Sequence, residues 1–213
     1  PLTVFCAAGL KKPVEEIAQA YQKETGTEVR LQYGGTGTLL SQIRIAKQGD
    51  LFIAADDGAL ADAKKLGVTR EEFQLAKQKP VLAVAKGNPK KIDSLPALKT
   101  DGIRLALPNP ESASIGRVTK KLLGAEWDAL AAKAAVMKPT VTEIAADLSL
   151  GAVDAAIVWD STVPQFAGLE AVILPELAKH EEFATAAVLD ACGQPSEAMR
   201  FARYLSAPEK GAK

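Results

Sequence analysis

The sequence predicts an α/β fold in two lobes, each built on a mostly parallel sheet flanked by helices. Short apolar segments of β-forming residues alternate along the chain with longer segments whose apolar residues recur at helical spacing. Links that contain glycine join them, which favours parallel strands with right-handed crossovers. A polar linker at residues 87–91, GNPKK, separates two such series, and 213 residues suit two lobes of roughly 100 residues each.

The first series predicts strands that alternate with helices. Residues 2–7 are apolar and β-prone, and a helix with apolar residues at Leu10, Val14 and Ile17 follows them. Gly26 ends that helix, and Gly67 ends the third one. The expected strands are 2–7, 29–33, 50–55 and 80–86, and the later helices are 39–47 and 57–67.

The second series continues the same alternation. Its expected strands are 103–107, 153–159 and 183–189, and its helices are 115–123, 126–134, 141–150 and 196–205, the last capped by Ser196. We place residues 1–82 and 190–213 in a discontinuous first lobe and residues 83–189 in the second lobe. Hinge strands are expected near 80–86 and 183–190.

Composition narrows the classes of function. Basic and acidic residues balance at 26 each and aromatic residues make up 5%, so no nucleic-acid surface is expected. No apolar run approaches the ~18 residues that span a bilayer, so no membrane insertion is expected. Because the chain begins with Pro1 rather than Met, we expect that any targeting segment has already been removed.

The chain has no pattern typical of an enzyme. His180 is the only histidine, which excludes a paired-histidine zinc site. It lies in the charged run KHEE (179–182), which is expected at a solvated helix end and so argues against a Ser-His-Asp triad. Acidic pairs at 15–16 and 71–72 are expected on solvated helix faces. We expect no catalytic residue, no metal and no cofactor. For Cys6 and Cys192 two alternatives stay open, namely two free thiols or one disulfide in an oxidising compartment.

Four junctions share a different chemistry. Each is small or hydroxylated and opens a helix: AAGL (7–10), GGTGT (34–38), ESASIG (111–116) and PTVT (139–142). The first turn of a helix offers unpaired N–H groups and the positive end of the helix dipole. Several such ends together bind a small anion without Arg or Lys, and Gly9, Gly35 and Thr36 suit close approach and donation.

Structural alternatives exist for the same residues. Thr36, Ser112 and Ser114 could be ordinary helix caps. Trp159 is either a half-buried aromatic residue or a cleft wall that donates its indole N–H.

At these residues the sequence resembles the periplasmic molybdate-binding proteins of ABC importers. The resemblance runs through nearly the whole chain. Its strongest segments are LTVFCAAGL (2–10), YGGTGTL (33–39), GDLFIAAD (49–56), LALPNPE (105–111) and VDAAIVW (153–159).

The resemblance implies the two-lobe periplasmic-binding-protein fold, also called the Venus flytrap, with an oxyanion bound in a cleft between the lobes. It implies a monomer in the periplasm or another extracytoplasmic compartment that delivers its ligand to a membrane permease, with a lipid anchor before trimming as an alternative. The ligand-binding residues that it implies, together with their neighbours, are Gly9, Gly35, Thr36, Ser114, Ile115, Val141, Trp159 and Asp160.

This sequence departs from the family pattern at two side-chain donor positions, and a neighbouring residue adds a negative charge. Gly9 stands where a Ser is usual and Trp159 where a Tyr is usual, while the carboxylate of Asp160 would repel an anion that it faced. Molybdate or tungstate is therefore the first expectation for the ligand. Sulfate, a phosphorus oxyanion or a small organic acid are the alternatives. The effector domain of a transcription regulator and an enzyme stay open as other classes of function.

Overall fold

The computed structural model describes residues 1–209, which divide into two compact units. The first unit holds Pro1–Lys77 and the described residues from Glu182 onward, and the second holds Gln78–Glu181. These boundaries differ from the expected ones at 82/83 and 189/190. Strand pairing explains the difference, because residues 80–85 pair within the second sheet and residues 182–189 pair within the first. The hinge role of these strands stays a prediction.

The first unit is built on a mixed five-stranded sheet. In spatial order its strands are β2 (Val29–Gly34), β1 (Leu2–Ala7), β3 (Leu51–Ala54), β10 (Glu182–Leu189) and β4 (Thr69–Gln78). β1 runs parallel to β2 and β3, whereas β10 runs antiparallel to β3.

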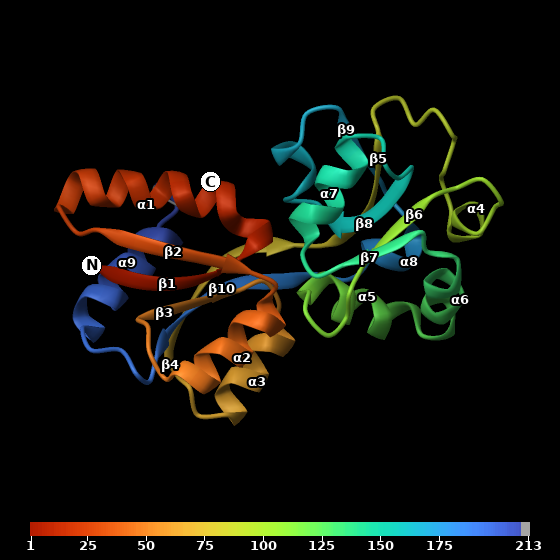
Figure 1. Ribbon diagram of the computed structural model, residues 1–213. Coiled ribbons are helices and arrows are strands. Elements are labelled where there is room, and N and C mark those ends of the chain that lie inside the picture. Colours follow the sequence, from red (N-terminus) through yellow and green to blue (C-terminus); the bar gives the residue numbers. More distant parts are fainter. Residues whose placement is uncertain (210–213) are drawn as a thin grey trace. The chain divides into compact units, whose positions relative to one another are not determined.

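Helices cover both faces of this sheet. They are α1 (Lys11–Thr25), α2 (Thr36–Ala46), α3 (Asp57–Lys65) and α9 (Pro195–Ser206), with a 3₁₀ turn, η1 (Ala8–Leu10), before α1. α1 and α9 pack on one face, and α2 and α3 pack on the other (Figure 1). Side chains along β1 point alternately to the two faces of the sheet. Val4 and Cys6 therefore pack with α1 and α9, while Phe5 packs with α2.

The second unit has its own mixed sheet. In spatial order its strands are β7 (Val136–Lys138), β6 (Leu105–Pro108), β8 (Ala155–Trp159), β5 (Pro80–Ala85) and β9 (Leu169–Val172). β6 is parallel to β7 and β8, and β5 is antiparallel to β8 and β9. The helical segments are α4 (Leu95–Leu98), α5 (Ser114–Leu123), α6 (Ala125–Lys133), α7 (Val141–Ser149), η2 (Val163–Gln165) and α8 (Pro175–Ala178).

The predicted α/β class is confirmed, with local corrections. The prediction that residues 71–72 are helical is wrong, because they lie in β4, an edge strand that tolerates charge. α2 begins at Thr36 rather than near residue 39. Ser196 is not a cap, because α9 starts at Pro195, whose fixed φ suits a first helical turn, and its N-cap is Gln194.

The two cysteines are free thiols, so the disulfide alternative is wrong. Cys6 is buried in the core of the first unit, and burial raises the pKa of its thiol. Cys192 is partly exposed, and its Sγ lies 3.1 Å from Asp50 Oδ1. Burial, followed by this hydrogen bond, raises the pKa of Cys192 to about 11. Both thiols are therefore protonated and unreactive near neutral pH.

Candidate functional site

The carboxyl ends of three parallel strands meet at one edge of the first sheet. Ala7 at the end of β1 pairs with Gly34 at the end of β2, and Cys6 pairs with Ile53 of β3. The helical segments that follow therefore start side by side. We call this stretch, residues 7–10 and 34–38, the first donor edge. In open α/β sheets, ligands bind at such carboxyl edges.

The start of α2 is the clearest donor on this edge. Gly35 is its N-cap, and no side chain caps the helix. The first helical hydrogen bond runs from Leu39 N to Gly35 O at 2.9 Å, so the N–H groups of residues 36–38 have no partner among residues 1–209. Thr36 is only 2% exposed and its hydroxyl caps nothing, so the interpretation of Thr36 as a cap is wrong.

Gly9 and Lys11 flank the same edge. Gly9 lies in the middle of η1 and is buried. Lys11 Nζ stands 5.2 Å from the centre of the Tyr33 ring, a distance at which a cation–π interaction forms. Burial raises the pKa of the Tyr33 hydroxyl. Sequence reasoning expected no cation here, although Lys11 directly follows the first junction.

The second sheet has a matching edge. β7, β6 and β8 are parallel, with Pro108 paired to Lys138 and Ala106 to Ala156. The segments that follow these strands begin α7, begin α5 and form the turn after Trp159. We call residues 111–116, 139–142 and 159–162 the second donor edge.

The start of α5 holds two hydroxyls without partners. Ala113 is the N-cap, and its methyl group cannot accept a hydrogen bond. The N–H groups of Ser114 and Ile115 therefore have no partner among the described residues. The Oγ atoms of Ser112 and Ser114 are buried and have no hydrogen-bond partner within the described chain, and Ser114 is only 5% exposed. The interpretation of these serines as caps is wrong.

Gly116 brings α5 close to the end of β6. A Cβ added at Gly116 would lie 2.6 Å from Pro108 O and 2.8 Å from Asn109 O. Only glycine permits this approach, which fixes the distance between the helix start and the strand end.

The start of α7 is capped in the ordinary way. Thr140 Oγ1 accepts a hydrogen bond from Glu143 N at 3.3 Å and donates one to Glu143 Oε2 at 2.6 Å. Val141, 5% exposed, is the first helical residue, and its N–H has no partner within residues 1–209. Thr140 is thus committed to the cap, while the N–H of Val141 stays available.

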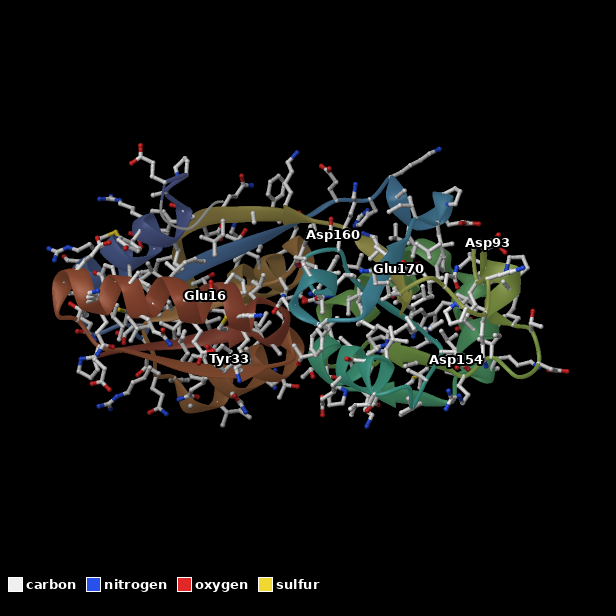
Figure 2. All side chains as sticks on the ribbon, turned by 90° about the horizontal axis from the view of Figure 1, so that it is seen from above. Glu16, Tyr33, Asp93, Asp154, Asp160 and Glu170 are labelled. Carbon is white, nitrogen blue, oxygen red and sulfur yellow. The ribbon has the colours of Figure 1, made fainter. Side chains whose placement is uncertain are left out.

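Trp159 packs in an apolar core, and Asp160 is hydrogen-bonded to backbone N–H groups. Trp159 is 1% exposed and belongs to the apolar core of the second unit. Asp160 Oδ1 accepts hydrogen bonds from Lys79 N at 3.1 Å and Ser161 N at 2.8 Å (Figure 2). Sequence reasoning missed Thr162, whose fully buried Oγ1 has no partner among the described residues. Its only signal was a hydroxyl three residues beyond a strand end.

No group of three or more His, Cys, Asp or Glu side chains within residues 1–209 is arranged to hold a metal ion. In the same part of the chain, no helix is both long and apolar enough to cross a membrane.

Sheets with donor-rich carboxyl edges are typical of proteins that bind a small polar solute. The chain belongs to the family of bacterial extracellular solute-binding proteins, whose profile matches residues 2–212.

Two curated relatives extend over most of the chain. A binding protein of Haemophilus influenzae is 29% identical over 210 residues, 98% of this chain and 86% of its own length. The molybdate-binding protein ModA of Mycobacterium bovis is 26% identical over 209 residues, 97% of this chain and 79% of its own length.

Solved structures share the fold. The periplasmic molybdate-binding protein of Azotobacter vinelandii has a TM-score of 0.80 at 20% identity, covering 99% of this chain and 94% of that one. The sulfate-binding protein SubI of Mycobacterium tuberculosis has a TM-score of 0.83 at 15% identity, covering 98% of this chain and 82% of that one. At such identities the likeness extends to the fold alone.

Proposed function

We propose that this chain is the solute-binding component of an ABC importer and binds a small tetrahedral oxyanion, with molybdate or tungstate preferred. It would act as a monomer in the periplasm and deliver the anion to a membrane permease. Family membership and the relatives named for molybdate support this proposal.

The observation that carries the proposal is the start of α5. Two buried hydroxyls without partners, those of Ser112 and Ser114, stand beside two unpaired helix N–H groups. An unsatisfied buried polar group costs about 1–3 kcal/mol. After small side-chain rotations, an oxyanion at this position would accept hydrogen bonds from these groups and remove that cost.

The ligand contacts that we propose are neutral donors. Gly9, Gly35 and Thr36 would serve from the first donor edge, and Ser114, Ile115, Val141 and Trp159 from the second. Backbone N–H and indole N–H groups only donate, so they favour an anion that only accepts, such as a fully deprotonated tetrahedral dianion. A protonated phosphate is less favoured, because only the hydroxyls of Thr36 and Ser114 could accept a hydrogen bond from its O–H.

A second candidate is the same transport role with another ligand, namely sulfate, a phosphorus oxyanion or a small organic acid. Gly9 favours it, since a side-chain hydroxyl expected for molybdate is missing there. The other sequence argument for this candidate was the charge of Asp160. It is weaker now, because Oδ1 of Asp160 is occupied by two backbone N–H groups.

A thermal-shift screen tests the choice. The purified chain is melted with molybdate, tungstate, sulfate, phosphate, chromate and a set of carboxylates. A ligand at about a thousand times its Kd adds about 4 kcal/mol of stability, which raises Tm by several degrees. We expect molybdate and tungstate to give the largest shifts. A response to a carboxylate or phosphate alone would establish the second candidate, and no response to any anion would overturn the proposed function.

A further inference from the structure

The turn after β8 is bonded to the segment where the chain enters the second unit. Lys77 is the last residue of the first unit's N-terminal segment, and Gln78 and Lys79 begin the second unit. Asp160 N donates to Lys79 O at 2.9 Å, and Lys79 N donates to Asp160 Oδ1 at 3.1 Å. Ser161 Oγ donates to Gln78 Oε1 at 2.9 Å. Two consecutive residues of the turn therefore hold two consecutive residues of the entering chain.

The sequence explains why a side-chain acceptor is needed here. β5 begins with Pro80, which pairs with Trp159 and has no N–H to give to the sheet. The ladder is continued instead by Lys79, whose N–H finds its acceptor in the side chain of Asp160. The same Oδ1 also accepts from Ser161 N at 2.8 Å, which closes the turn. A shorter or apolar side chain would leave both N–H groups without an acceptor.

The turn is part of the second donor edge, and its residues are hydrogen-bonded to one another. Thr162 N donates to Trp159 O at 2.9 Å, and Gln165 Nε2 donates to Ser161 O at 2.8 Å. Residues 159–162 are thus tied to one another and to Gln78–Lys79 as one bonded assembly.

We propose that Asp160 is a positioning residue for ligand binding, which orients Trp159 by fixing the turn to the entering segment Gln78–Lys79. This inference rests on the proposed function. Asp160 touches no ligand in this mechanism. Trp159 makes the contact with the ligand, and Asp160 acts on Trp159 only by holding the turn against Gln78–Lys79.

The test uses isothermal titration with molybdate, or with the strongest anion of the thermal-shift screen. Asp160→Asn keeps an acceptor oxygen and removes the charge, so we expect its Kd within about threefold of the parent value. Asp160→Ala removes the acceptor, and we expect its Kd to rise about tenfold or more. Glu170→Ala is the matched control, because Glu170 Oε2 also accepts a backbone N–H, that of Gly87 at 3.0 Å, in the same unit. We expect its Kd to be unchanged.

A double variant separates positioning from a general loss of structure. If Asp160 acts through Trp159, Asp160→Ala adds little to the loss already caused by Trp159→Phe. Fully additive losses would overturn the inference. So would an affinity gain of about tenfold or more in Asp160→Asn, because that would place the charge against the anion.

A measurement without ligand keeps this inference distinct from the proposed function. Amide hydrogen exchange of Lys79 and Ser161 should accelerate in Asp160→Ala and stay near the parent rate in Asp160→Asn. Unchanged exchange in Asp160→Ala would overturn the positioning role even if the chain binds an oxyanion. Failure of the parent chain to bind any anion would overturn the proposed function, and with it the role of Asp160 in binding, whatever the exchange rates.

Discussion

Asp154 shows what a single carboxylate does when its partners are all cations and N–H groups. Its oxygens accept from Lys90 Nζ at 2.9 Å, from Arg104 N at 2.8 Å and from the Arg104 guanidinium at 2.8 and 3.2 Å (Figure 2). The hydrogen bond from Arg104, followed by that from Lys90, holds the pKa of Asp154 well below its usual range. The side chain of Asp154 is 10% exposed, so the network is partly shielded from solvent.

This network predicts a pH-dependent stability. Asp154→Asn should lower the free energy of unfolding at pH 7 by about 1–3 kcal/mol, as loss of hydrogen bonds to a charged group does. Because folding lowers the pKa, the carboxylate stabilises the parent above its ordinary pKa of about 3.9, and the effect fades as pH falls toward the folded value. Urea unfolding at pH 7 and near pH 3 should show a smaller gap between parent and variant at the lower pH.

The control for this prediction is a carboxylate with one exposed partner. Asp101 is paired with Lys133 at 3.0 Å, but its side chain is 97% exposed. Asp101→Asn should leave stability nearly unchanged, as surface ion pairs contribute little. An equal loss in both variants would mean that net charge, rather than the network, sets the effect.

Two threonines show where sequence reasoning reaches its limit at this scale. Thr36 and Thr140 both stand where a helix begins, in similar glycine- or proline-containing junctions. Thr140 lies one residue before α7 and caps it, whereas Thr36 is the first residue of α2 and leaves its hydroxyl uncommitted. A shift of one residue decides between cap and candidate donor, and helix starts are not readable from a sequence to one residue.

At the scale of elements, strands buried on both faces were predictable. The edge strand β2 was predicted too, but the edge strands β4, β7 and β9 were not. β3 and β8 are apolar throughout, β1 is apolar apart from Thr3, and all three lie inside their sheets, so their composition identifies them as strands. β4, TREEFQLAKQ, lies at a sheet edge and carries charges on its exposed face. Those charges prevent the edge from pairing with a strand of another chain. They also interrupt the apolar pattern by which a strand is recognised in a sequence.

Helix α5 provides the prediction at this scale. Gly116→Ala places a methyl group 2.6 Å from Pro108 O, so α5 must move away from β6. We expect a loss of about 1–3 kcal/mol in the free energy of unfolding, typical of overpacking. The start of α5 moves with the helix, so molybdate affinity should fall as well. Urea unfolding and calorimetric titration measure the two effects.

Gly193 supplies the matched control. A Cβ at Gly193 meets nothing within 4 Å, so Gly193→Ala should change neither stability nor affinity. If Gly116→Ala were as harmless as Gly193→Ala, the start of α5 would not depend on its close approach to β6.

For the whole molecule, the second unit is an insertion in the sequence of the first. The chain leaves the first unit after Lys77 and returns to it at Glu182, so the donors of the second edge all lie within one inserted segment. Each unit has its own sheet and its own core clusters. The sequence predicted two units from its two α/β series, but the polar segment at 87–91 lies inside the second unit and not between the units. The boundaries depended on strand partners that only tertiary structure selects.

Paired variants test whether the donors of each edge contribute to anion binding. Thr36→Ala removes a hydroxyl from the first edge, and Ser114→Ala removes one from the second. Each should raise the Kd for molybdate about tenfold or more, the effect of losing one hydrogen bond to a charged ligand. Titration should give one anion per chain in both variants, and the double variant should show roughly additive losses. Ser41→Ala is the control, because Ser41 Oγ is exposed and bonded to Gly37 O within α2. If the edges bound separate anions, the parent would bind two per chain and each variant would weaken only one of them.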